Sequence, residues 1–204
     1  MRLVDVDFEP AAIVMPDDVR RYVAAARHRI DQMEESEREA IPAFVPSDFG
    51  DVYRALQHVY HTRIATGRRF IEWGSGLGVV ACMASLVGFD AVGIEIEPLL
   101  VKIARSLAER FEIEVQLACG SFVPSGAESL VDSAGEVTWL RTDVPDAYAE
   151  LELDPDDFDL VFAYPWPGEE QVIFDLFKHC ASVGALLLTY HSQDGVRLQR
   201  KVRK

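Results

Sequence analysis

Phe70-Ile71-Glu72-Trp73-Gly74-Ser75-Gly76-Leu77-Gly78 is the stretch that decides the fold of this chain. The residues from Arg69 to Trp73 predict an apolar strand, and three glycines follow at alternate positions before a helical run that begins at Val79. Glycine tolerates the backbone angles of a tight turn and leaves the main chain bare. A strand, a glycine turn and a helix N-terminus together predict a site where a small ligand lies against the backbone.

The spacing of the glycines separates the candidate ligands. The dinucleotide pattern G-x-G-x-x-G places its third glycine one residue later than Gly78, where this chain has Val79. A phosphate loop needs Gly-Lys-Ser/Thr, which does not follow here. The carboxylate of Glu72 repels a pyrophosphate but attracts an ammonium or sulfonium group. The spacing therefore favours a cationic ligand, and the alternative is that the glycines form only a strand-to-helix turn.

The pattern Glu-x-Gly-x-Gly-x-Gly resembles motif I of the class I S-adenosylmethionine-dependent methyltransferases. This resemblance implies an α/β fold, a Rossmann-like doubly wound, mostly parallel sheet with helices on both faces. It also implies S-adenosyl-L-methionine as the cofactor, with Glu72 near the cationic methionine portion. The loop residues that the resemblance places beneath the ligand are Gly74, Ser75, Gly76 and Gly78.

A second strand is predicted at residues 91–96, after a turn at Gly88-Phe89-Asp90. Two parallel strands joined by one helix form a right-handed βαβ unit. An acid at the end of the second strand accepts hydrogen bonds from ribose hydroxyls in nucleotide folds and methyltransferases alike. Glu95 is therefore the predicted ribose ligand, and Ile96 beside it is a predicted cofactor contact.

The third predicted strand, residues 113–119, runs into Gly120-Ser121-Phe122, a corner predicted to contact the cofactor. In many methyltransferases this corner carries an acid that binds the adenine amino group. Ser121 stands at the matching position here, and Asp143 is a rival candidate for the same contact.

A fourth strand, residues 157–163, is followed by Tyr164-Pro165-Trp166-Pro167. This loop partly resembles the Asp/Asn-Pro-Pro-aromatic signature of amino-group methyltransferases, but Ala163 stands at the Asp/Asn position, which opposes methylation of a nucleobase. Tyr164 is predicted to contact the cofactor, and Tyr164 and Trp166 to face the transferred methyl group or a cationic acceptor. The alternative is a proline-rich corner that only ends a strand.

His191 follows a fifth predicted strand, residues 184–190, and a helix over residues 169–180. With Tyr164 it is a candidate catalytic residue, because a neutral histidine is able to accept a proton. The alternative is a strand-end histidine bonded to a loop carbonyl. Residues 196–204 predict one antiparallel strand and residues 136–141 an irregular edge. We therefore expect five parallel strands, in a sheet that is smaller than the family norm of about seven strands or completed differently.

Residues 1–68 are predicted to form an N-terminal helical cap, and residues 69–204 the cofactor-binding domain. Apolar periodicity predicts helices over residues 17–40 and 49–65. Ordinary packing of two helices on a sheet explains the cap residues as well as a pocket does. The predicted acceptor pocket consists of Phe44, Ser47, Tyr53, Trp166, Glu169 and Tyr190. No metal site is expected from His58 and His61, since no third ligand follows their spacing.

Composition favours a cytoplasmic enzyme with a cationic acceptor. The 204 residues are 49% hydrophobic and carry a formal net charge of −14, which opposes a nucleic-acid partner because phosphates need clustered Lys and Arg. The basic tail, residues 197–204, is predicted to be a solvated edge strand. No apolar run is long enough to span a membrane, and the three cysteines have no metal spacing.

These patterns predict an S-adenosylmethionine-dependent methyltransferase that acts on a small molecule or an amine-bearing acceptor, including a protein lysine. The alternative is a protein that binds S-adenosylmethionine or a nucleotide without turnover. The acceptor pocket is expected to be built from loops, whose spacing does not identify a small molecule.

Overall fold

One mixed sheet of seven strands forms the centre of the molecule in the computed structural model, which describes residues 1–9, 14–33, 41, 44–132 and 140–203. The strand order is β1-β7-β6-β5-β2-β3-β4. The strands are β1 (Arg2–Asp5), β2 (Arg69–Trp73), β3 (Asp90–Glu95), β4 (Gln116–Cys119), β5 (Leu160–Ala163), β6 (Leu186–Tyr190) and β7 (Val196–Val202).

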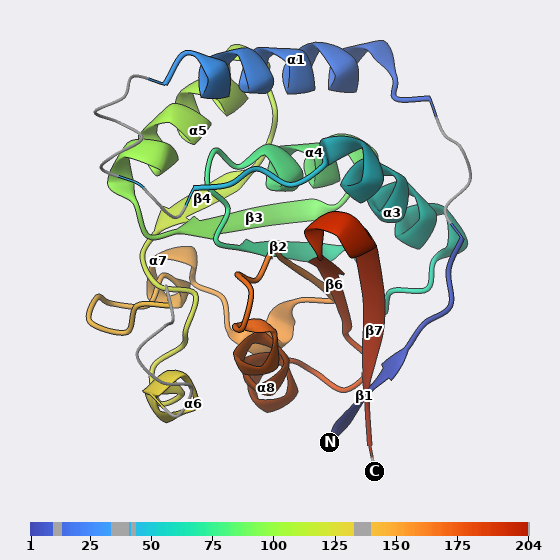
Figure 1. The fold of residues 1–204 in the computed structure, drawn as a ribbon, viewed down its shortest axis with the longest axis vertical. Coiled ribbons are helices and arrows are strands. Elements are labelled where there is room, and N and C mark those ends of the chain that lie inside the picture. The colour runs from blue at the N-terminus through green and yellow to red at the C-terminus, as the bar shows by residue number, and fades with distance from the viewer. Residues whose placement is uncertain (10–13, 34–40, 42–43, 133–139, 204) are drawn as a thin grey trace.

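Helices cover both faces of this sheet (Figure 1). The α-helices are α1 (Asp17–Asp31), α3 (Phe49–Thr62), α4 (Val79–Val87), α5 (Pro98–Arg110), α6 (Glu128–Asp132), α7 (Tyr148–Leu151) and α8 (Glu170–Cys180), and the 3-10 helices are η1 (Pro155–Asp157) and η2 (Ser192–Asp194). Helices α3, α4 and α5 lie on one face with α1 packed on α4, and α6, α7 and α8 lie on the other (Figure 1). A hydrophobic core lies on each face of the sheet, and successive strand residues point into opposite cores. Phe70 belongs to one core and Ile71 to the other.

Five adjacent strands, β4, β3, β2, β5 and β6, run parallel, as the Rossmann-like prediction requires. Successive strands β2, β3 and β4 extend the sheet in one direction, and the chain then returns to place β5 on the other side of β2. This reversal creates a topological switch point beyond the carboxyl ends of β2 and β5, where doubly wound sheets bind ligands. The predicted fold class is confirmed.

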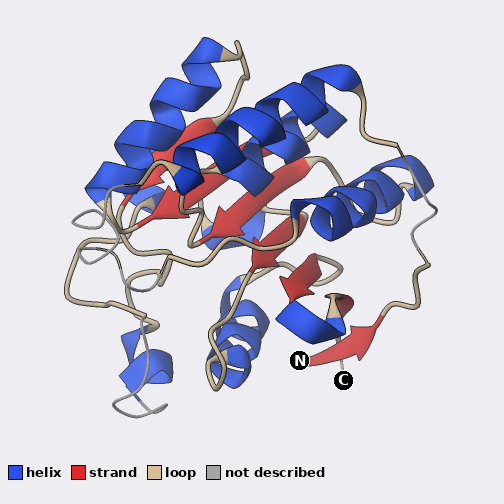
Figure 2. Cartoon of the chain, turned by 45° about the horizontal axis from the view of Figure 1, so that its top comes forward, coloured by secondary structure: helices blue, strands red, loops and turns tan. Residues whose placement is uncertain are grey.

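The sheet is not smaller than the family norm, but it is completed differently, because an N-terminal strand adds its seventh strand. Strand β1 pairs antiparallel with β7, from Arg2 opposite Val202 to Asp5 opposite Gln199 (Figure 2). An ion pair between Asp5 and Arg197 (2.8 Å) joins the same two strands. Residues 1–68 thus contribute a strand to the sheet as well as helices. No local pattern in four residues reveals a partner that lies almost two hundred residues away.

The basic tail is likewise not a solvated edge strand. Strand β7 lies between β6 and β1, inside the sheet. Arg200 donates to the carbonyl oxygens of Gly184 (3.0 Å) and Ile64 (2.7 Å), and the buried Lys201 donates to the carbonyl oxygen of Ala181. These cations satisfy backbone acceptors at the rim of the sheet.

The two helices predicted over residues 17–40 and 49–65 are present as α1 and α3, and both end earlier than predicted. Helix α1 ends at Asp31, nine residues before the predicted end at Ala40, and residues 34–40 lie outside the described part. Asp48 caps α3 by accepting from the backbone N–H groups of Gly50 (2.7 Å) and Asp51 (3.0 Å). Of the predicted edge at 136–141, residues 136–139 lie outside the described residues and 140–141 are not in a strand.

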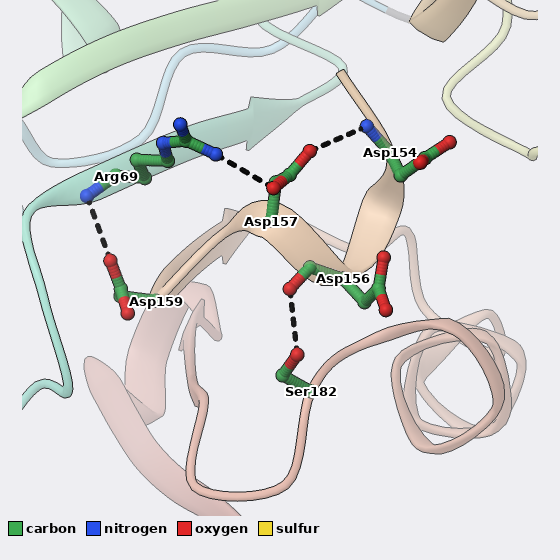
Figure 3. Close-up of polar contacts among 6 residues, drawn as sticks. All are labelled: Arg69, Asp154, Asp156, Asp157, Asp159 and Ser182. Atoms are coloured by element: carbon green, nitrogen blue, oxygen red, sulfur yellow. Dashed lines mark hydrogen bonds and ion pairs between the residues drawn. The ribbon is translucent and has the colours of Figure 1, made fainter.

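Charged residues tie β2 to the turn before β5 at the amino-terminal end of the sheet (Figure 3). The Arg69 guanidinium pairs with Asp157 (2.7 Å), and its backbone N–H donates to Asp159 (3.0 Å). The Ser182 hydroxyl donates to the Asp156 carbonyl oxygen (2.6 Å). The acidic turn therefore holds the strands in register at the edge opposite the ligand side.

In the described parts of the chain, no helix is long and apolar enough to cross a membrane.

Candidate cofactor and acceptor site

A cavity of about 650 Å³ opens at the carboxyl ends of the parallel strands, with part of the N-terminal segment in its wall. The predicted site residues that line it are Phe44, Ser47, Glu72, Gly74, Ser75, Gly76, Glu95, Ile96, Gly120, Ser121, Phe122, Tyr164, Trp166, Glu169 and His191. The predicted residues Gly78, Tyr53, Tyr190 and Asp143 do not line it. Residues of β2, β3 and β5 line this cavity, and so do Gly120 after β4 and His191 after β6, so the switch point and the cavity coincide.

The glycine turn packs tightly onto β3. The backbone N–H groups of Gly74 and Ser75 donate to the Ile94 carbonyl oxygen at 3.0 and 2.8 Å. Gly76 has a φ of 54°, a left-handed conformation that favours glycine. Gly78 caps α4 outside the cavity, and a Cβ there would lie 3.0 Å from the Leu117 side chain. The missing side chain of Gly78 thus serves packing, and Gly78 is not among the lining residues, although it was predicted to contact the cofactor.

Glu95 clamps the loop to the end of β3. Its carboxylate accepts from the backbone N–H groups of Gly76 (2.7 Å), Ile96 (2.8 Å) and Glu97 (3.0 Å). Burial raises the pKa of Glu95, and these three hydrogen bonds act in the opposite direction. Since a carboxylate has about four lone-pair sites, a position remains for a ligand hydroxyl.

Replacing Glu95 by alanine is expected to weaken S-adenosylmethionine binding at least 10-fold. The substitution removes the predicted ligand contact and leaves three backbone donors without their acceptor, and each hydrogen bond to a charged group contributes about 1.5–3 kcal/mol. Calorimetric titration and thermal melts measure both effects. Glu109→Ala, which removes an exposed carboxylate on α5, is the matched control. Unchanged affinity in Glu95→Ala would exclude a ribose contact at this carboxylate.

Glu72 is buried in the wall of the cavity, where β2 ends against α4. One carboxylate oxygen accepts from the Ala81 backbone N–H (2.8 Å). Burial is the main cause that raises the pKa of Glu72 well above its usual value, and the nearby charge of Glu95 adds to it. This environment therefore disfavours the ionised form of Glu72.

Helix α1 places Tyr22 next to this acid. Tyr22 is fully buried, and burial raises its pKa, with Cys82 and Glu72 as further causes. The neighbour of its hydroxyl is the Cys82 thiol, a weak hydrogen-bonding group. Burial also raises the pKa of Cys82 to about 12, so this thiol stays protonated. Within the described ranges, no cation contributes to the pKa shift of Glu72.

The predicted adenine contacts are placed unfavourably. The Ser121 hydroxyl donates to the Arg141 carbonyl oxygen (2.7 Å) and accepts from the Val123 backbone N–H (3.1 Å). It retains only an acceptor lone pair for a ligand. Asp143 forms an exposed ion pair with Arg141 (2.8 Å), and of the two only Arg141 lines the cavity. The hydrogen bond from Ser121 to Arg141 joins two distant parts of the long connection between β4 and β5. No local spacing in the sequence indicates this contact.

An aromatic pair stands beside Ser121. The Phe122 ring stacks on Trp73 at 5.3 Å between centroids and 6° between planes, and both side chains line the cavity. Trp73 is a lining residue that the sequence patterns did not indicate. Its position immediately before Gly74, at the end of β2, is the signal that would have identified it.

Tyr164 and Trp166 follow the end of β5 and line the cavity. Tyr190, predicted as a pocket residue, instead packs edge-on against Tyr164 at 4.9 Å between ring centroids. Its hydroxyl lies next to the Asp48 backbone, so Tyr190 supports the wall from behind. Tyr53 is buried in the core, and its hydroxyl accepts from Gln57 (2.7 Å).

His191 lines the same end of the cavity. Its Nε2 lies 2.7 Å from the Thr189 hydroxyl oxygen, and its backbone N–H donates to the Gly195 carbonyl oxygen (2.7 Å). Burial lowers the pKa of His191, so the imidazole is neutral near pH 7. The strand-end arrangement expected as the alternative is present in the backbone, while the ring still reaches the site.

Acidic side chains predominate in the lining. Besides Glu72 and Glu95, the lining carboxylates are Glu97, Glu169, Glu170 and Asp194, against one guanidinium, Arg141. Sequence reasoning missed Asp194, although the turn after β6 ends at the same sheet edge. Among the described residues, no group of three or more His, Cys, Asp or Glu side chains is arranged to hold a metal ion. The electrostatic character of the cavity favours a cation.

Known proteins of similar structure share this architecture. No protein-family model matches the chain. A ribosomal protein L11 methyltransferase from Ralstonia pickettii (strain 12J) is 34% identical over 76 residues, 37% of this chain and 24% of the relative. The chain thus matches about a quarter of the length of that curated relative.

Three solved structures extend the likeness to most of the chain. A methyltransferase from Geobacter sulfurreducens is 15% identical with a TM-score of 0.56, over 94% of this chain and 93% of that one. An RNA methyltransferase from Salinibacter ruber, in complex with S-adenosyl-L-homocysteine, is 20% identical with a TM-score of 0.52, over 77% and 92%. An O-methyltransferase from Bacillus cereus, also in complex with S-adenosyl-L-homocysteine, is 17% identical with a TM-score of 0.51, over 88% and 68%. The chain has the Rossmann-like fold of class I methyltransferases.

Proposed function

We propose that this protein is an S-adenosylmethionine-dependent methyltransferase. The observation that carries the proposal is the glycine turn flanked by two buried carboxylates, Glu72 and Glu95, in one cavity at the switch point of the sheet. Two acids beside a bare backbone oppose a pyrophosphate and suit a ligand that has a ribose at one end and a cationic amino-acid portion at the other. The bound S-adenosyl-L-homocysteine of two structural neighbours supports the same choice.

Each part of this cofactor can be assigned to residues that line the cavity. Glu95 would hold the ribose hydroxyls, and Glu72 the cationic methionine portion, with Gly74 to Gly76 beneath the ligand. Phe122 and Trp73 would provide an apolar surface for the adenine. When bound, the cofactor supplies a methyl group on an electrophilic sulfonium. The protein contributes proximity and in-line orientation, which are sufficient for an acceptor that presents a free lone pair.

The acceptor that we propose is a small molecule or an amine-bearing group, including a protein side chain. The carboxylates of Glu169, Glu170 and Asp194 attract a cation, and the ring faces of Tyr164 and Trp166 add to this attraction. Ala163 offers no side-chain acceptor for a nucleobase amino group. A relative that is named for a ribosomal protein substrate keeps proteins among the candidates. Residues 1–68 would act as the cap of the site, since Phe44 and Ser47 lie in its lining.

Calorimetric titration with S-adenosylmethionine, S-adenosyl-L-homocysteine and NAD tests the cofactor. We expect both sulfur ligands to bind with micromolar affinity and NAD not to bind. Binding of NAD without binding of the sulfur ligands would overturn the proposal. Transfer of a labelled methyl group from S-adenosylmethionine to small-molecule, protein and RNA fractions of a cell extract then tests turnover. Label in the RNA fraction alone would contradict the acceptor class, and binding without any transfer would favour a non-catalytic binding protein.

A further inference from the structure

Thr189 is a polar residue at a place where β6 is otherwise apolar and fully buried. The strand reads Leu186, Leu187, Leu188, Thr189 and Tyr190, and the Thr189 side chain has no exposed surface. A buried hydroxyl without a hydrogen bond costs free energy, so its partner has to be identified. In the described part of the chain, the hydroxyl has one partner, Nε2 of His191 at 2.7 Å.

The hydrogen bond of this hydroxyl determines which imidazole nitrogen of His191 carries the proton. No carbonyl or carboxylate oxygen of the described residues accepts from Thr189, so its O–H is satisfied only when it donates to Nε2. A nitrogen that accepts a hydrogen bond carries no proton, and a neutral imidazole then carries its proton on Nδ1. The lowered pKa of His191 agrees with a neutral ring.

We infer that Thr189 holds His191 as the Nδ1–H tautomer, so that His191 presents a hydrogen-bond donor, and not a general base, to the methyl acceptor. This inference rests on the proposed function. It corrects the role expected for His191, because the lone pair needed to take up a proton is engaged by Thr189 inside the protein. Thr189 is then a positioning residue. A group that lies against Nδ1 has to offer a lone pair, as a carbonyl, hydroxyl or ring nitrogen does.

Charged groups around the ring do not reverse this assignment. Glu170 on α8 and Asp194 on η2 raise the pKa of His191, whereas Arg197 on β7 lowers it. Arg197 is itself paired with Asp5 of β1. Burial is the largest influence and disfavours the imidazolium. The ring therefore remains neutral at the pH where an amine acceptor begins to lose its own proton.

The tautomer is measured directly by long-range proton–nitrogen NMR of the uniformly labelled protein, with the His191 signals assigned from the His191→Asn variant. We expect the Nδ1–H form of neutral His191 in the wild type and in Thr189→Ser, and a larger Nε2–H population in Thr189→Val. Thr62→Val, which removes a hydroxyl at the exposed end of α3, is the control. A wild-type ring protonated on Nε2 would overturn the inference, and so would an unchanged tautomer in Thr189→Val.

Paired amide substitutions separate a donor from a base. An asparagine side chain places its N–H groups near the position of Nδ1, a glutamine near that of Nε2, and neither takes up a proton. For labelled methyl transfer to the active extract fraction, we expect His191→Asn to keep at least a tenth of the wild-type initial rate. His191→Ala and His191→Gln should lose about 100-fold, the usual effect of misplacing a reactant. An equal loss in His191→Asn and His191→Ala would establish a base and overturn the inference.

Failure of this inference is distinguishable from failure of the proposed function. S-adenosyl-L-homocysteine binding by the wild type and by the Thr189 and His191 variants reports on the cofactor site alone. If the wild type does not bind this ligand, the proposed function fails, while the NMR measurement still decides the tautomer. A thermal melt of each variant shows whether it is folded, and Thr189→Ser keeps the test valid should Thr189→Val fail to fold.

Discussion

Gly76→Val is expected to abolish S-adenosylmethionine binding, with an affinity loss of at least 100-fold. A Cβ at this position would lie 2.7 Å from the Phe44 ring, and φ at Gly76 is 54°. A β-branched residue is strained in this region of backbone space, at a cost of about 1–3 kcal/mol. The valine side chain and the displaced ring would both occupy the space above the loop, where the ligand is proposed to lie. Calorimetric titration measures the loss.

Gly126→Val is the matched control for this effect. Gly126 also has a positive φ, 92°, but a Cβ there meets no atom within 4 Å, and the residue does not line the cavity. The control therefore carries backbone strain without obstruction of the site, and its affinity should equal that of the wild type. Unchanged affinity in Gly76→Val would place the ligand elsewhere. Equal losses in both variants would attribute the effect to strain.

Glu72→Gln is expected to stabilise the free protein and at the same time to weaken cofactor binding. The pKa of Glu72 is raised in the folded state, so its contribution to stability is present below the unfolded pKa, near 4.3, and is lost as the pH rises toward the folded pKa. A neutral glutamine does not suffer this loss. The variant should therefore melt at a higher temperature than the wild type, and the difference should grow from pH 5 to pH 8. Each kcal/mol corresponds to about 2–4 °C for a protein of this size.

Cofactor binding should respond in the opposite direction. The cationic methionine portion is proposed to draw Glu72 into its ionised form, so binding to the wild type should release a proton and strengthen as the pH rises. Titrations in two buffers of different ionisation enthalpy count this proton. Glu72→Gln should bind at least 10-fold more weakly and release fewer protons. Glu109→Gln, an exposed substitution, is the control, and a proton count unchanged by Glu72→Gln would contradict the assignment.

Residues close in the chain were predictable because one short segment contains all the determinants. The strand, glycine turn and helix from Arg69 to Val87 agree with the structure, since alternation, glycine positions and helix starts are local properties. Glu72, Glu95 and Tyr164 meet in one cavity because parallel strands end at the same edge of a sheet. The position of these three residues at one site was therefore predictable from the order of strands and helices along the chain.

Contacts between distant segments were not predictable from these patterns. Tyr190 was expected in the pocket, but its ring packs against Tyr164 and its hydroxyl lies next to Asp48, a residue far away in the chain. Ser121 was expected to contact adenine, but its hydroxyl is committed to Arg141 and Val123. A side chain's type is visible in the sequence, whereas its hydrogen-bond partner is chosen by the packing of the whole chain.

By itself, the sequence determined a Rossmann-like sheet and a glycine turn bordered by acids suited to a cationic ligand, because backbone preference and strand-end position are set within a few residues. Only the tertiary structure decided that β1 completes the sheet and that Gly78 serves packing. It also brought the Thr189 hydroxyl to Nε2 of His191, with the consequence for its role inferred above. The physical reason is that strand pairing, close packing and the satisfaction of buried hydrogen bonds depend on which groups the fold brings together, often from opposite ends of the chain.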